Sequence, residues 1–164
     1  VPLLKPIVTQ YSAVVVKEAM ILHGGNGILG DFSVLHRVLN DAIINETWEG
    51  THALLAEHAI HAAKRPKVQS AFEAYLKEGL DGMDAERREV AQNIWNELKP
   101  LLADDFERDV NRMYICEKLW RVFALVETQR WVQKFADAEN QKQAGLLMAF
   151  TRQNARMPYR LSPA

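Results

Sequence analysis

Residues 23–51 read HGGNGILGDFSVLHRVLNDAIINETWEGT, with a glycine-rich turn at one end and a carboxylate, Glu49, at the other. Gly50 and Thr51 follow the carboxylate directly. Glycine allows backbone conformations that other residues avoid, and threonine is a good helix cap. Glu49 therefore lies on adaptable backbone in front of a helix. This arrangement indicates a base held against a ligand more than a residue of a hydrophobic core.

Outward from this stretch, apolar residues recur at helical spacing and strand signals are nearly absent. Helix-ending glycines at Gly24-Gly25, a helix-starting Pro66 and a capping Asp84 supply the boundaries. We therefore predict an all-α fold, a helical bundle, in which the state of 41–48 stays open. The predicted helices span about 5–23, 33–40, 50–64, 66–79, 84–98, 104–138 and 141–154.

Two details of this pattern concern the later helices. The segment 113–126 is apolar almost all round, which predicts a helix buried on several sides at the centre of a bundle. Pro100 is expected to end the helix that Asp84 begins. The last residues, 157–164, are expected to form a loose tail.

Composition bounds the possible functions. The chain has 164 residues, 48% hydrophobic content and a net charge of −1, so neither nucleic acid nor an anionic membrane is favoured globally. A lone cysteine, Cys116, excludes an internal disulfide, favours a reducing compartment such as the cytoplasm, and is expected to be an inert core residue. No apolar run approaches the ~18 residues of a membrane span. The start at Val1 has neither an initiator Met nor a signal-peptide layout, so we expect a piece of a longer protein.

Three signals in order resemble the acyl-CoA dehydrogenase family: the turn Gly24-Gly25-Asn26-Gly27, the dipeptide Asn40-Asp41 and the triplet Glu49-Gly50-Thr51. The resemblance covers residues 1 to about 64. It implies that 1–64 form the end of the family's C-terminal helical domain. Residues 65–164 resemble the extra helical domain of the adaptive-response or very-long-chain branches, and Trp48 is similar to the adaptive-response branch.

The resemblance implies α,β-dehydrogenation of an acyl-CoA thioester with FAD, in an oxidoreductase of fatty acid metabolism that is a homo-oligomer. Glu49 would be the catalytic base, and its backbone N–H would donate to the thioester oxygen. Gly50 would allow close approach to the substrate, and Trp48 would line the acyl pocket. A base for this weakly acidic proton needs a pKa raised by burial.

The cofactor contacts follow from the same resemblance. Thr51 would contact the flavin, while Gly24 and Gly25 would approach the FAD of a neighbouring subunit. Asn40 stands where the family usually has Arg, and Ile21 and Ala53 stand where it usually has Gln. These changes weaken the expected flavin contacts but not the fold. This chain alone is expected to be inactive and to associate with itself through exposed apolar surface.

Other interpretations remain open at this point. Glu49 could be a charge that favours a helix N-terminus, and the glycine turn could be a plain helix terminator. Trp48 could be core. His58 and His61 are three residues apart, but EHAIH lacks the HExxH order of zinc proteases, so no metal is expected. The basic cluster Lys64, Arg65 and Lys67 is expected to be solvated.

At the level of the whole molecule, two alternatives compete with the enzyme. One is a divergent, non-catalytic family member that binds a protein or DNA partner through its helical extension. The other is a stand-alone helical interaction module with a chance motif. The charges of residues 64–164 are nearly balanced, which is typical of a solvated bundle surface.

Overall fold

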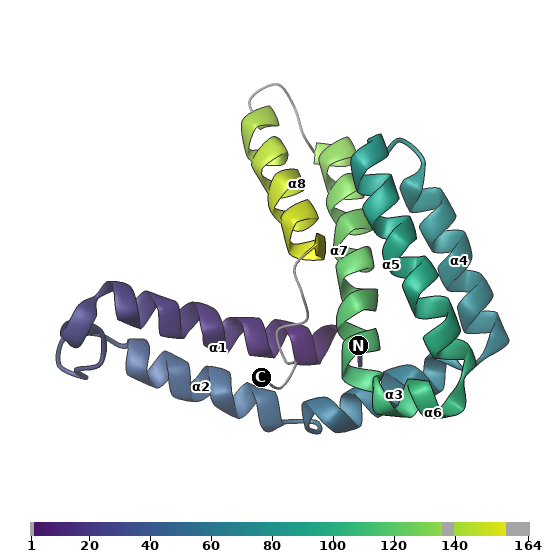
Figure 1. Ribbon diagram of the computed structural model, residues 1–164. Helices are drawn as coiled ribbons and strands as arrows, with labels where there is room; N and C mark the ends of the chain where they lie inside the picture. Colours follow the sequence, from purple (N-terminus) through teal and green to yellow (C-terminus); the bar gives the residue numbers. More distant parts are fainter. Residues whose placement is uncertain (1, 136–139, 157–164) are drawn as a thin grey trace. The chain divides into compact units, whose positions relative to one another are not determined.

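The computed structural model describes residues 2–135 and 140–156, and these residues contain eight α-helices, one 3₁₀-helix and no strand (Figure 1). The all-α prediction is therefore confirmed. The elements are α1 (Leu4–Leu22), η1 (Gly24–Gly27), α2 (Leu35–Thr47), α3 (His52–Ala63), α4 (Pro66–Leu80), α5 (Ala85–Ala103), α6 (Asp105–Val110), α7 (Arg112–Phe135) and α8 (Gln141–Arg156).

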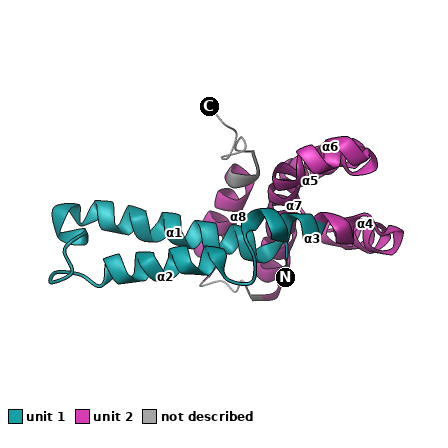
Figure 2. Ribbon diagram, turned by 90° about the horizontal axis from the view of Figure 1, so that it is seen from below, with its two compact units in different colours: residues 1–59 teal, residues 60–164 magenta. Residues whose placement is uncertain are grey.

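The chain divides into two compact units, residues 1–59 and residues 60–164 (Figure 2). The division rests on where contacts are dense within each part. The domain boundary predicted after residue 64 rests on the family resemblance and not on packing. It stays a prediction.

In the first unit, α1 and α2 form an antiparallel hairpin (Figure 1). Gly27 is buried where the connection folds back on α1, and a Cβ added there would lie 2.2 Å from the carbonyl oxygen of Met20. Only glycine fits so close to a backbone atom. Ser33 Oγ accepts a hydrogen bond of 3.0 Å from the Leu35 N–H at the start of α2. The segment 41–47, which the sequence left open, continues α2.

In the second unit, α7 lies between α5 and α8 and also packs against α4 (Figure 1). Ile115, Val122, Leu125 and Val126 have no exposed surface, which confirms the prediction of a helix buried on several sides. Burial of each such side chain stabilises the fold by roughly 1.5–3 kcal/mol. This helix therefore organises the core of the second unit.

Two helix boundaries differ from the sequence prediction. Helix α5 continues through Pro100 to Ala103, because Leu98 and Leu102, one turn apart, are both buried and their burial outweighs the hydrogen bond that proline lacks. The prediction of a single helix over 104–138 is wrong, since the helix is interrupted at Asn111, between α6 and α7. The Asn111 Nδ2 donates to the Glu107 carbonyl at 2.8 Å and caps α6. The expected end near Ala138 and the tail 157–164 lie outside the described residues.

None of the helices in the described ranges is long and apolar enough to cross a membrane.

Candidate functional site

The turn between α2 and α3 carries the most unusual backbone of the chain. Glu49 has a φ of 60° and Gly50 a φ of 111°. Glu49 is the one non-glycine residue with positive φ among those that the structure describes. A residue with a Cβ in this region costs of order 1–3 kcal/mol, and such strain clusters at functional sites. The residue that the sequence selected as a base is thus the one with a strained backbone.

The side chains of this turn face solvent in the chain as it stands. Glu49 is exposed, and no ion pair forms to its carboxylate within residues 2–135 and 140–156. Trp48 is 66% exposed, so the interpretation of Trp48 as core is wrong for this chain. The Thr51 Oγ1 accepts from the Leu54 N–H at 3.5 Å, and its carbonyl accepts from the Leu55 N–H at 3.0 Å. Thr51 therefore caps α3, as predicted.

Three side chains from different helices meet beside the turn. His52, the first residue of α3, places Nε2 3.3 Å from Thr9 Oγ1 of α1 and 3.6 Å from Glu46 Oε2 of α2. The Lys5 Nζ donates to the Gly50 carbonyl at 3.5 Å. No local sequence signal indicated this group, because Thr9 and His52 are 43 residues apart.

The threonine, histidine and carboxylate do not form a hydrolase relay. In such a relay the nucleophile and the acid contact opposite ring nitrogens. Here Thr9 and Glu46 both lie at the Nε2 of His52. The Thr9 hydroxyl donates to the Lys5 carbonyl at 2.9 Å, so toward the histidine it acts as a hydrogen-bond acceptor. The arrangement holds the histidine in place and activates no nucleophile.

The glycine turn lies at the opposite end of the hairpin from Glu49 (Figure 1). The 13 residues of α2 span about 20 Å between the two turns. Gly24 has a φ of 59°, and no heavy atom lies within 4 Å of a Cβ placed on Gly24 or Gly25. The backbone there is open to close approach by a flat or anionic group. The predicted site residues therefore form two separate groups and line no common cavity.

The histidine pair on α3 does not gather further metal ligands. His58 and His61 are both exposed. Across the described part of the chain, no three or more His, Cys, Asp or Glu side chains lie close enough to hold a metal ion.

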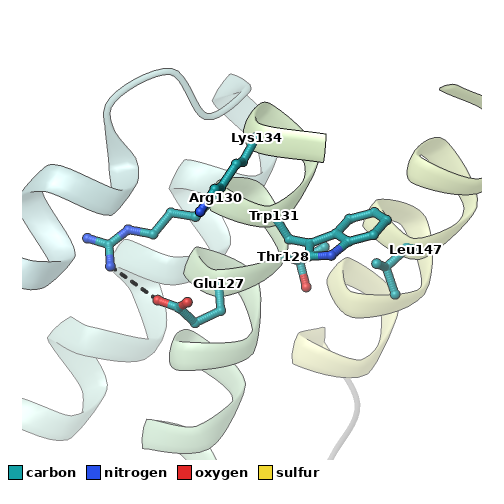
Figure 3. A pocket seen from close by; sticks show the side chains of 6 residues that line it. All are labelled: Glu127, Thr128, Arg130, Trp131, Lys134 and Leu147. Atoms are coloured by element: carbon teal, nitrogen blue, oxygen red, sulfur yellow. Dashed lines mark hydrogen bonds and ion pairs between the residues drawn. The ribbon is translucent and has the colours of Figure 1, made fainter. Parts of the chain in front are cut away.

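The second unit contains an open groove between α7 and α8 that the sequence did not predict (Figure 3). Its volume is about 510 Å³. Trp131 points toward Leu147 across the groove, whereas Arg130 extends to the other side of α7, where it pairs with Glu127 at 3.2 Å. The groove is lined by Glu127, Thr128, Arg130, Trp131, Lys134 and Leu147.

Five basic side chains of the second unit, all among the described residues, form ion pairs with carboxylates of the same unit, which lowers the positive potential that they present to a nucleic acid. Pairs within the described residues are Lys64–Asp105, Lys99–Glu73, Lys118–Glu97, Arg130–Glu78 and Arg152–Glu86. The DNA-binding alternative stays a prediction.

Comparison with known families gives a match for residues 1–64. Residues 1–64 contain the helical hairpin and the Glu49 turn. They match the family model of the acyl-CoA dehydrogenase, C-terminal domain. The resemblance to this family that was drawn from the sequence is therefore confirmed over residues 1–64. No curated protein and no solved structure matches the chain.

Proposed function

We propose that this chain supplies the C-terminal part of an FAD-dependent acyl-CoA dehydrogenase, with Glu49 as the base. The observation that carries the proposal is the coincidence at Glu49. Glu49, to which the resemblance assigns the role of base, lies within the matched residues 1–64 and is also the non-glycine position with positive φ in the described chain. A strained backbone persists where the surrounding structure enforces it and function uses it.

In the proposed reaction, the Glu49 carboxylate removes the α-proton of the acyl thioester. A thioester α-proton is weakly acidic, so negative charge that develops on the thioester oxygen must be stabilised. The N–H of Glu49 would donate to that oxygen, and the N-terminus of α3 would add a positive dipole end beside it. Bound FAD would supply the two-electron acceptor for the hydride that is released from the β-carbon as the double bond forms.

The neighbouring residues have supporting roles in this proposal. Gly50 lets the substrate approach the backbone, since no Cβ projects from it. The exposed indole of Trp48 is available to line an acyl pocket. Thr51 caps α3 and would contact the flavin.

The residues that would hold the cofactor fit it in part. Gly24 and Gly25 present open backbone, which suits the approach of an adenine or a pyrophosphate. Their distance from Glu49 supports a glycine turn that serves the FAD of a neighbouring subunit, so we propose a homo-oligomer. We also propose that this chain alone is inactive, since Glu49 is exposed rather than enclosed. The lone, buried Cys116 supports a reducing compartment, and we propose the cytoplasm.

The test uses the gene product that contains this chain, purified and examined for oxidised-flavin absorption. Anaerobic addition of acyl-CoA substrates of several chain lengths should bleach the flavin. Glu49→Gln should slow this bleaching by about 10³-fold or more, because the amide removes the base while keeping its size.

Glu57→Gln is the matched control, since Glu57 is an exposed carboxylate on α3 itself. Its bleaching rate should equal that of the unmodified protein. Equal rates for Glu49→Gln and Glu57→Gln would remove Glu49 as the base. Absence of bound flavin would contradict the proposed enzyme as a whole.

A further inference from the structure

We propose that His52 is a positioning residue that, together with Thr9 and Glu46, holds the Glu49 turn in its left-handed conformation. The inference deepens the proposed function, and its catalytic meaning rests on that function. The conformational statement can be tested without any turnover.

The contacts show why one imidazole can hold the turn. His52 Nε2 lies 3.3 Å from the Thr9 hydroxyl and 3.6 Å from the Glu46 carboxylate. Because the hydroxyl donates to the Lys5 carbonyl, it accepts from the histidine, and Glu46 can only accept. The Nε2 of His52 must therefore carry the proton. His52 thus donates a hydrogen bond to Thr9 of α1 and lies at ion-pair distance from Glu46 of α2.

The position of His52 in the chain transmits this attachment to Glu49. Helix α2 ends at Thr47 and α3 begins at His52, so four residues connect them. His52 fixes the first residue after the connection to both preceding helices. The bond from Lys5 to the Gly50 carbonyl fixes its middle. A connection this short, held at both ends and in the middle, leaves Glu49 few alternatives to its positive φ.

Left-handed backbone is intrinsically unfavourable at a residue that carries a Cβ, so contacts on both sides of the turn are needed to keep Glu49 in it. Loss of the histidine contacts would therefore release the turn toward ordinary conformations. His52 is half-buried, so solvent screening reduces the attraction to Glu46 without removing it.

The experiment measures backbone conformation in the 164-residue chain by NMR. The chemical shifts and the three-bond H–N–Cα–H coupling of Glu49 report its φ, and amide exchange of 50–55 reports local opening. In His52→Ala we expect the Glu49 signals to move toward those of ordinary backbone. Exchange at 50–55 should accelerate by about tenfold relative to the buried amides of α7.

Three further variants make the result specific. His58→Ala removes an exposed histidine from the same helix and should leave Glu49 unchanged. His52→Gln keeps an N–H donor and should restore most of the native signals. Thr9→Val removes only the hydroxyl and should give part of the His52→Ala effect, which keeps the test open if His52→Ala unfolds.

Native Glu49 signals in both His52→Ala and Thr9→Val would overturn the inference. So would an equal change in His58→Ala. A separate measurement in the flavin-containing gene product links the turn to catalysis: His52→Ala should lower kcat with His52→Gln restoring it. If Glu49→Gln leaves bleaching unchanged while the NMR effects of His52 are present, the proposed function fails and the positioning role stands.

Discussion

Gly79 of α4 and Val126 of α7 touch so closely that a Cβ added to the glycine would lie 2.2 Å from Val126 Cγ1. Both residues are buried. The two helices therefore approach each other through a position where a side chain is excluded.

Gly79→Ala should destabilise the chain by about 1–3 kcal/mol, because the added methyl forces the helices apart. Val126→Ala in the same chain should recover part of this loss, since the clashing methyl groups are gone. Urea unfolding followed by circular dichroism measures both. Gly145→Ala on α8 is the control. No atom lies within 4 Å of its added Cβ, so it should stabilise by about 0.5–1 kcal/mol. An unchanged midpoint in Gly79→Ala would contradict the close approach.

Glu49→Gly should stabilise the folded chain by about 1 kcal/mol, because glycine adopts a φ of 60° without steric cost. The same change removes the proposed base and should abolish flavin bleaching in the complete gene product. Glu57→Gly, in the interior of α3, should instead destabilise by about 1 kcal/mol. Thermal and urea unfolding distinguish the two substitutions. A loss of stability in Glu49→Gly would show that the turn carries no strain.

Arg87 is a buried cation that bonds no nearby carboxylate closely. Its guanidinium donates to Gln129 Oε1 at 2.6 Å and to the Leu125 carbonyl at 3.1 Å, and Asp84 lies 3.9 Å away. Burial lowers the pKa of Arg87, yet the group stays charged near neutral pH. The charge is therefore held largely by neutral oxygens.

Gln129→Leu should destabilise by about 1–3 kcal/mol, since it leaves the buried guanidinium with an unsatisfied donor. Arg87→Met combined with Gln129→Leu should cost less than the two single changes added together, because the pair is removed as a unit. A double-mutant cycle in urea measures the difference. Strict additivity would mean that the 2.6 Å contact contributes nothing of its own.

Cys116 should resist modification by thiol reagents in the native chain. Burial raises the pKa of its thiol from 9.0 to about 12, and only the thiolate reacts. Its reaction with a disulfide reagent at pH 8 should be at least about 100-fold slower than in urea. The pKa is raised only in the folded state. The buried neutral thiol therefore contributes its full stability to the fold below pH 9, and the fold loses this contribution as the pH rises toward 12. Cys116→Ala should therefore weaken the alkaline loss of stability, and rapid native labelling would contradict the burial.

The α1–α2 hairpin should associate with further copies at high concentration. Leu22 is 87% exposed, Phe32 70% and Ile28 67%, which is unusual for a stable monomer. Sedimentation should show an average mass that rises with protein concentration, and Leu22→Lys with Phe32→Ser should reduce the rise. Leu146→Lys on α8, where the side chain is also exposed, is the control. A constant monomer mass across the range would contradict the prediction.

The fold class, several helix boundaries and the turn before α3 could be predicted from the sequence, because they depend on local chemistry. Helical periodicity predicted the all-α fold, and Gly24, Pro66 and Asp84 marked helix boundaries within about two residues. The Glu49-Gly50-Thr51 triplet predicted a turn followed by a capped helix, and Thr51 caps α3. These features depend on residues within one helical turn of each other, so neighbouring sequence is sufficient to encode them.

Tertiary structure decided what local sequence could not. Burial of Leu98 and Leu102 carries α5 through Pro100, and the contact with Val126 requires the glycine at position 79. His52 meets Thr9 only because the fold brings the first residue of α3 back to α1 across 43 residues of chain. The left-handed backbone of Glu49 likewise depends on helices that hold its turn from both sides. The sequence alone determined which residue carries the carboxylate, whereas packing between distant helices decided how that carboxylate is presented.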